Sequence, residues 1–222
     1  MSAPQLLRDE EVHVPVGQVL VAGHLTVPRE PRGIVVFAHG SGSSRFSPRN
    51  IYVGDVLVSA GLATLLFDLL TPAEEQNRAN VFDIELLAAR LIGVTQWLRS
   101  QVDTAGLDVC YFGASTGGGA ALRAAADPAV SIAAVVSRGG RPDLAGRWLA
   151  EVDSPTLLIV GGRDEAVLEL NRQAGAAIPA ECRIAVIPDA THLFEEPGAL
   201  EQVAALARDW FLDHLTPIRA ES

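Results

Sequence analysis

A single serine lies among very small residues in Gly113-Ala114-Ser115-Thr116-Gly117, which matches the pattern G-x-S-x-G. An apolar run typical of a strand precedes it, and an alanine-rich run typical of a helix follows. In such a turn the serine hydroxyl projects above the edge of the sheet, and the glycines avoid clashes in the tight backbone. The pattern predicts a nucleophile. Glycine-rich turns also bind phosphate or allow close packing, but no lysine follows as in a phosphate-binding loop.

A serine hydroxyl becomes a good nucleophile only when a base takes its proton. His192 lies in IPDATHLFEE, just beyond the last predicted strand, and functional groups gather at the carboxyl ends of parallel strands. His13 and His24 fall in an N-terminal hairpin, His214 ends a helix, and His39 precedes a glycine-rich loop. We therefore predict that His192 is the base, the alternative being an ordinary surface histidine.

The base needs a carboxylate that fixes its tautomer and stabilises the imidazolium. Asp164 follows the apolar run PTLLIVGG and is the first candidate, although it could simply cap the next helix. Asp68, at another strand end, is the rival, and Asp189 is expected to lie in a turn. The order Ser115, Asp164, His192 is the one found in hydrolases with a strand-turn-helix nucleophile.

A negatively charged oxygen formed on the substrate needs two backbone amides directed at it. The Thr116 amide follows the serine directly. The second is expected from the loop after the strand GIVVFAHG, which reads HGSGSS, and we assign it to Ser41. Gly42 in the same loop is expected to contact the substrate.

These residues can meet only if the strands that they follow are parallel, so that the carboxyl ends of those strands lie at one edge of the sheet. A glycine turn divides EVHVPVGQVLVAGHLTVP into an antiparallel hairpin. Six further apolar runs alternate with helical segments: GIVVFAHG, LATLLFD, LDVCYF, IAAVVS, PTLLIVGG and CRIAVIP. This alternation predicts a three-layer α/β fold with a mostly parallel sheet of about eight strands and helices on both faces. Asn50 and Asn80 are expected to cap helices. We expect one domain over residues 1–222.

Composition narrows the function classes. The formal net charge of −10 argues against nucleic acid or an anionic membrane as a partner. The apolar segments are too short to cross a bilayer, no export signal is visible, and the two cysteines are expected to be thiols. A cytoplasmic location follows. The histidines and cysteines show no metal-ligand spacing, and we expect no cofactor. The oligomeric state stays open.

The motifs HGSGSS, GASTGG, GGRD and ATH together resemble those of the α/β-hydrolase superfamily. The resemblance extends from the N-terminal hairpin to the last helix, and the short layout is similar to the dienelactone-hydrolase-like branch. Dienelactone hydrolases proper use a cysteine nucleophile, whereas position 115 is serine. The resemblance therefore implies a serine esterase acting on small-molecule esters, in which Ser115 forms an acyl-enzyme and His192 transfers protons. A thioesterase, an acyltransferase or a non-catalytic ligand-binding protein are the alternatives.

Many members of the superfamily carry a lid between the strands IAAVVS and PTLLIVGG. Here the segment 138–154 has room only for a loop and one short helix, PDLAGRWLA, so we expect no large lid and a site open to small or soluble esters. Arg138 and Arg141 follow the first of these strands, where a guanidinium is suited to hold a substrate carboxylate or to pair with Asp143. Trp148 is a candidate pocket wall.

Overall fold

The computed structural model describes residues 4–216, which form eight strands, seven α-helices and one 3₁₀ helix. The strands are β1 (Leu6–Val16), β2 (Val19–Pro28), β3 (Ile34–Ala38), β4 (Ala63–Phe67), β5 (Val109–Ala114), β6 (Ala134–Arg138), β7 (Thr156–Gly161) and β8 (Cys182–Ile187). The α-helices are α1 (Pro48–Ser59), α2 (Pro72–Glu75), α3 (Arg78–Val81), α4 (Ile84–Ser100), α5 (Thr116–Ala125), α6 (Glu165–Ala177) and α7 (Ala199–His214). The 3₁₀ helix is η1 (Pro142–Glu151).

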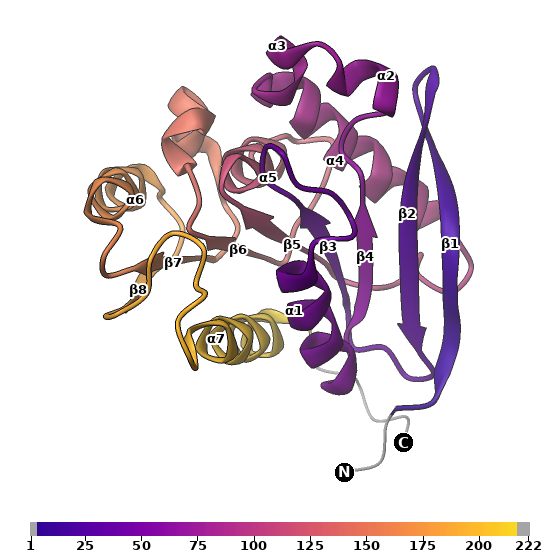
Figure 1. Ribbon diagram of the computed structural model, residues 1–222. Coiled ribbons are helices and arrows are strands. Elements are labelled where there is room, and N and C mark those ends of the chain that lie inside the picture. Colours follow the sequence, from indigo (N-terminus) through magenta and orange to yellow (C-terminus); the bar gives the residue numbers. More distant parts are fainter. Residues whose placement is uncertain (1–3, 217–222) are drawn as a thin grey trace.

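All eight strands form one sheet in the order β1-β2-β4-β3-β5-β6-β7-β8. Strand β2 pairs antiparallel with β1 and β4, and the strands from β4 to β8 pair in parallel. Helices α4, α5 and α6 cover one face, and α1 and α7 cover the other (Figure 1). The predicted eight-stranded, mostly parallel sheet with an N-terminal hairpin is therefore confirmed.

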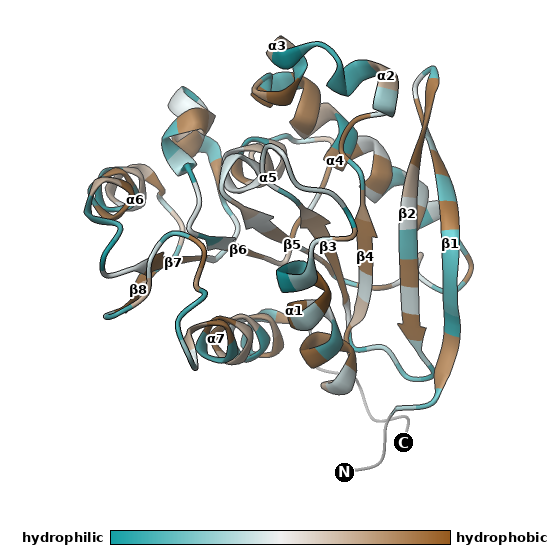
Figure 2. Ribbon diagram, viewed as in Figure 1, coloured by the Kyte–Doolittle hydropathy of each residue, from teal (hydrophilic) through white to brown (hydrophobic). Residues whose placement is uncertain are grey.

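The central strands are apolar without interruption because both of their faces are buried. In β3, Ile34, Val36 and Ala38 belong to the core on one side of the sheet. Val35 and Phe37 belong to the core on the other side, as the alternation of side chains along a strand requires. Figure 2 shows hydrophobic residues along these central strands and hydrophilic ones toward the outer helices and loops.

Two helix starts differ from the sequence prediction. Helix α1 begins at Pro48 with Ser47 as its cap, so Asn50 lies inside the helix rather than before it. Helix α4 begins at Ile84, where the Asp83 side chain accepts a hydrogen bond from the Leu86 amide at 3.0 Å. Serine and aspartate cap helices as well as asparagine does, so residue type alone does not choose among neighbouring candidates.

The connection from β6 to β7 contains η1 and no larger covering element, as expected. This 3₁₀ helix is interrupted at Gly146, whose φ of 55° lies in the left-handed region. The short helices α2 and α3 lie between β4 and α4, at the upper rim of the sheet in Figure 1. Within residues 4–216 no helix has the length and apolar character needed to cross a membrane.

Candidate active site

Ser115 alone separates β5 from α5 and adopts φ 51° and ψ −122°, a region that non-glycine residues rarely occupy. Its side chain does not cap the helix that it precedes. A strained residue of this kind costs about 1–3 kcal/mol and is typically found at functional sites. The half-buried hydroxyl is thus held at the N-terminus of α5 by the surrounding fold.

The flanking glycines are required by close backbone contacts. A Cβ atom at Gly117 would lie 2.1 Å from the carbonyl oxygen of Ala38, and one at Gly113 would lie 2.6 Å from the carbonyl oxygen of Gly117. At Gly40 a Cβ atom would lie 3.0 Å from the Cβ of Ser115. The loop after β3 therefore packs directly against the serine turn.

His192 and Asp164 meet across two loops that follow neighbouring strands. The Nδ1 atom of His192 lies 2.6 Å from Oδ2 of Asp164. Asp164 stands at the N-cap position of α6 but makes no capping hydrogen bond, so its carboxylate serves the imidazole instead. When Nδ1–H donates to the carboxylate, the lone pair of Nε2 is free to accept a proton.

The other two candidate carboxylates have different partners. Asp68 accepts hydrogen bonds from the backbone amide and the guanidinium of Arg45, and so anchors the loop that follows β3. Asp189 is exposed and pairs with Arg163 at 3.3 Å. Among the three carboxylates considered, Asp164 is the one that contacts His192.

The loop that carries His192 is fixed by its neighbours. Phe194 has φ 56° and is buried in the core beneath α7. Glu196 accepts a hydrogen bond from the Thr191 amide at 3.0 Å, and this hydrogen bond lowers the pKa of its carboxyl. Gly139 faces the loop: a Cβ atom there would lie 3.1 Å from the His192 carbonyl oxygen. Rigid support of this kind limits the positions that the imidazole can take.

Ser115 and His192 line one cavity of about 540 Å³, and the loop from Gly40 to Ser44 forms another of its walls. Ser41 and Gly42 are both part of this wall. Thr116 directly follows Ser115 and is the first residue of α5, and the first amides of a helix have no acceptor within that helix. The predicted oxyanion amides thus belong to segments on either side of the serine.

His39 is a residue whose role the sequence did not reveal. Its Nδ1 donates to the Gly40 carbonyl oxygen at 3.0 Å, and its Nε2 accepts from the Leu69 amide at 3.1 Å. Both bonds are satisfied only by the neutral tautomer with the proton on Nδ1. The buried imidazole thereby ties the start of the glycine-serine loop to the end of β4. A histidine immediately before this loop was the available signal.

Arg138 lies at the end of β6, and its carbonyl oxygen accepts the Ser115 amide at 3.3 Å. The residue is among those that line the Ser115 cavity, and it is only 9% exposed. The Nη2 atom lies 3.5 Å from Oδ1 of Asn50, and Nη1 has no partner among the described residues. Burial, together with the positive charge of Arg49, lowers the pKa of Arg138 to about 10. The guanidinium is still cationic at neutral pH.

Arg141 and Trp148, predicted as substrate contacts, are not placed in this cavity. Arg141 donates two hydrogen bonds of 2.8 Å to the carboxylate of Asp143, which raises the pKa of the guanidinium. Trp148 donates from Nε1 to Glu85 at 2.9 Å, and its ring lies beneath the guanidinium of Arg123. Position after a strand brings a residue near the rim, but the local partner decides where its side chain points.

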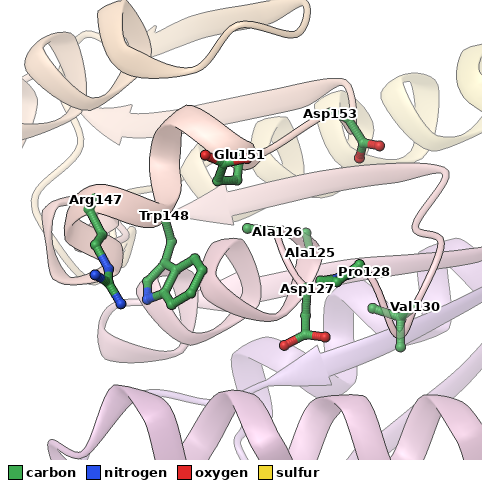
Figure 3. Close-up of a pocket in the computed structure, with 9 residues that line it drawn as sticks. All are labelled: Ala125, Ala126, Asp127, Pro128, Val130, Arg147, Trp148, Glu151 and Asp153. Atoms are coloured by element: carbon green, nitrogen blue, oxygen red, sulfur yellow. The ribbon is translucent and has the colours of Figure 1, made fainter.

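Trp148 lines a separate cavity of about 620 Å³ at the C-terminal end of α5 (Figure 3). Its lining also includes Arg147, Asp127, Glu151 and Asp153, and it includes neither Ser115 nor His192. Within residues 4–216, no group of three or more His, Cys, Asp or Glu side chains is arranged to hold a metal ion.

Comparison with solved structures gives a close relative. A dienelactone hydrolase from Anabaena variabilis superposes with a TM-score of 0.92 at 55% sequence identity, covering 97% of this chain and 100% of that one. Est1E from Butyrivibrio proteoclasticus has a TM-score of 0.77 at 17% identity, covering 92% of this chain and 98% of its own. A dienelactone hydrolase-like promiscuous phosphotriesterase, P91, also has a TM-score of 0.77 at 17% identity, covering 94% of this chain and 99% of its own. The last two show a shared fold.

The chain is an α/β-hydrolase, as the sheet order, the strained serine turn and these likenesses together establish. Within that superfamily it belongs to the dienelactone-hydrolase-like family. The resemblance seen in the sequence motifs is confirmed.

Curated relatives carry a different name. Two proteins of Mycobacterium tuberculosis, each named "Putative phosphoribosyl transferase", are 74% identical over 209 residues, which is 94% of this chain and 47% of each relative. The chain thus spans about half the length of the curated relatives that it matches. No protein-family model matches the chain.

Proposed function

We propose that this chain hydrolyses carboxylic esters through a nucleophilic serine, Ser115. One observation carries the proposal: the strained serine turn shares a cavity with a histidine whose Nδ1 lies 2.6 Å from the half-buried carboxylate of Asp164. The imidazole lone pair left on Nε2 is what a serine nucleophile requires. Membership of a hydrolase family supports the same class of reaction.

In the proposed mechanism Ser115 Oγ attacks the ester carbonyl carbon while His192 Nε2 takes the hydroxyl proton. Asp164 stabilises the resulting imidazolium, and the amides of Ser41 and Thr116 donate to the oxyanion. The carbon–oxygen bond to the alcohol then breaks, and His192 returns the proton to the departing alcohol. Water repeats the sequence on the acyl-enzyme and releases the carboxylic acid.

The open site favours small or soluble esters, lactones included. The cavity of about 540 Å³ has no large covering element, and its walls are the glycine-serine loop and the start of α1. The mycobacterial relatives' name concerns proteins of which this chain matches 47%, so the proposal concerns the reaction of this chain alone.

Replacement of the nucleophile tests the proposal. Ser115→Ala should lower kcat for p-nitrophenyl acetate by roughly 10⁴-fold or more, because removing a triad member leaves only binding and the oxyanion amides. Ser131→Ala is the matched control and should keep wild-type turnover. Ser131 is exposed and precedes β6, so it lies at the edge of the sheet opposite to that of Ser115, which follows β5. Circular dichroism verifies that both variants fold.

Turnover of Ser115→Ala at the wild-type rate would contradict the choice of nucleophile. Faster reaction of matched thioesters would assign a thioesterase, and preferential transfer to added alcohols would assign an acyltransferase. A folded wild-type protein that turns over none of these substrates would favour a ligand-binding role.

A further inference from the structure

A second cavity, of about 430 Å³, lies against the loop that carries the proposed oxyanion amide of Ser41. The five residues from Gly40 to Ser44 line both this cavity and the one that contains Ser115. The proposed proton transfers use groups of the Ser115 cavity alone. The second cavity has the size of a small-molecule site and no role in the mechanism described so far.

The rest of its wall is largely apolar. Beyond the shared loop the cavity is lined by His39, Leu69, Leu70, Glu75, Val81 and Leu87. The three leucines are buried in the core, and the half-buried Val81 of α3 packs against that core. Both ring nitrogens of His39 are hydrogen-bonded in its neutral form. Such a wall suits an alkyl group. We call this space the α2–α3 cavity.

One carboxylate holds the two short helices that contribute to the α2–α3 cavity. Glu74 of α2 accepts hydrogen bonds from the amide and the hydroxyl of Thr71 at 2.9 and 3.0 Å, and it forms an ion pair with Arg90 of α4. Its backbone carbonyl accepts the side-chain amide of Asn80 at 2.9 Å. These contacts fasten α2 and α3 at the rim of the sheet above β4 (Figure 1), so the cavity is preformed.

The position of His192 decides which part of an ester enters this cavity. In the proposed mechanism His192 Nε2 returns a proton to the departing alcohol, so the alcohol lies on the His192 side of the reacting carbonyl. His192 lines the Ser115 cavity and is not among the residues that line the α2–α3 cavity. The acyl chain is the part that extends away from His192, across the shared loop.

Glu75 gives the α2–α3 cavity a negative charge. Its exposed side chain forms no ion pair with a basic residue of residues 4–216, whereas the neighbouring Glu74 is paired with Arg90. An unpaired carboxylate repels another carboxylate brought close to it. The cavity therefore suits an uncharged chain better than one that ends in a carboxylate.

We propose that the α2–α3 cavity is the acyl-chain subsite of the esterase, in which Val81 sets the room for the chain and Glu75 disfavours chains that end in a carboxylate. The inference rests on the proposed function and deepens it, because it names the substrate class: esters of uncharged aliphatic acids.

A series of p-nitrophenyl esters tests the acyl preference. From acetate to hexanoate, kcat/KM should rise by about two- to fourfold for each added methylene, the range for burying a methylene against an apolar wall. Alkyl acetates from ethyl to hexyl, in which the alcohol lengthens instead, should show a smaller rise. A kcat/KM that falls steadily as the acyl chain lengthens, or a larger rise in the alkyl acetates, would overturn the proposal.

Variants of Val81 locate the preference. Val81→Phe should lower the ratio of kcat/KM for hexanoate to that for acetate by about tenfold or more, because the ring fills space that the longer chain needs. Val81→Ala should shift the preference to longer chains. Val102→Phe is the matched control, since Val102 is 96% exposed and lines neither cavity, and the ratio should persist. An unchanged ratio in folded Val81→Phe would contradict the assignment.

The role of Glu75 is tested with one pair of substrates. The wild-type protein should favour p-nitrophenyl methyl adipate over the anionic p-nitrophenyl hydrogen adipate by about threefold or more in kcat/KM, and Glu75→Gln should remove most of this gap. Glu201→Gln, at an exposed position of α7 outside both cavities, is the control and should keep the gap. Equal kcat/KM for the two adipates, or the same gap in Glu75→Gln, would count against this role.

Binding without turnover separates this proposal from the esterase proposal. The ketone 2-octanone cannot be hydrolysed, and it should raise the Tm of the wild-type protein and of Ser115→Ala more than acetone does at the same concentration. In Val81→Phe the difference between the two ketones should shrink. This readout decides the subsite even if the esterase proposal fails. No difference between the ketones in the wild-type protein, or an equal difference in Val81→Phe, would overturn the subsite.

Discussion

Ser115 holds a left-handed backbone conformation that the surrounding residues impose. The turn has room for it because glycine occupies the positions where β5, α5 and the loop after β3 approach one another. The strained backbone of Ser115 and the glycines around it serve the same purpose. They let the fold hold the hydroxyl at the cavity, at a cost in stability. Such a trade-off is usual where a site is preorganised.

Gly117→Ala should therefore lower the free energy of unfolding by about 3 kcal/mol or more, because its methyl group would lie 2.1 Å from the Ala38 carbonyl oxygen. Urea unfolding measures the change. Gly106→Ala is the control: a Cβ atom there has open space around it, and stability should change by less than about 1 kcal/mol. Equal stability of the two variants would show that the turn has room to adjust.

The sequence predicted a site of Ser115, Asp164 and His192 because strand ends in a parallel sheet share one rim, and in the structure His192 contacts Asp164 and lines one cavity with Ser115. It did not separate Arg138 from Arg141, which stand three positions apart. The difference is that Arg141 pairs with Asp143, whereas Arg138 forms no ion pair with a carboxylate of residues 4–216. Whether an arginine finds a carboxylate depends on the direction of its side chain and on residues distant in the sequence. Arg49 of α1, for example, lies near Arg138 only in the folded chain.

At the scale of elements, the strands were predictable and the caps were not. Uninterrupted apolar runs identify strands buried on both faces, so the order of strands and helices follows from the sequence. Cap residues such as Ser47 and Asp83 compete with neighbours of equal propensity, and tertiary packing decides between them. The loops of the site were located by the strands they follow rather than by any local pattern.

The hairpin β1–β2 carries a pH-dependent contact. His24 bonds to Asp9 at 2.7 Å and to Glu11 at 3.2 Å. Partial burial works against the charged ring, but the two carboxylates outweigh it and raise the pKa of His24 above 6.5. A raised pKa in the folded state stabilises the protein at pH values below the unfolded pKa, and this stabilisation is lost as pH rises through the folded pKa.

His24→Gln should accordingly lower the free energy of unfolding more at about pH 5.5 than at about pH 8.5, by a few tenths of a kcal/mol, because solvent screens this exposed contact. Denaturant unfolding at both pH values measures the difference. His13→Gln, at an exposed position of β1 in the same hairpin, is the control, and its loss should differ less between the two pH values than the loss in His24→Gln. A larger loss at the higher pH would contradict the assigned direction of the pKa shift.

The whole molecule combines a formal net charge of −10 with two incompletely paired arginines in one cavity. An acidic protein repels anions at long range, so an anion that binds must be attracted by local charges. The curated relatives are about twice as long as the region that this chain matches.

The rate at which a fluorophosphonate labels the protein, with the adduct located by peptide mass spectrometry, tests the central claim most directly. We expect the adduct on Ser115, and we expect Asp164→Asn to slow labelling by roughly 10⁴-fold, because the imidazole then loses its orienting carboxylate. Asp189→Asn, an exposed carboxylate near His192 in sequence, should label at the wild-type rate. Labelling at another residue, or labelling of Asp164→Asn at the wild-type rate, would contradict the account.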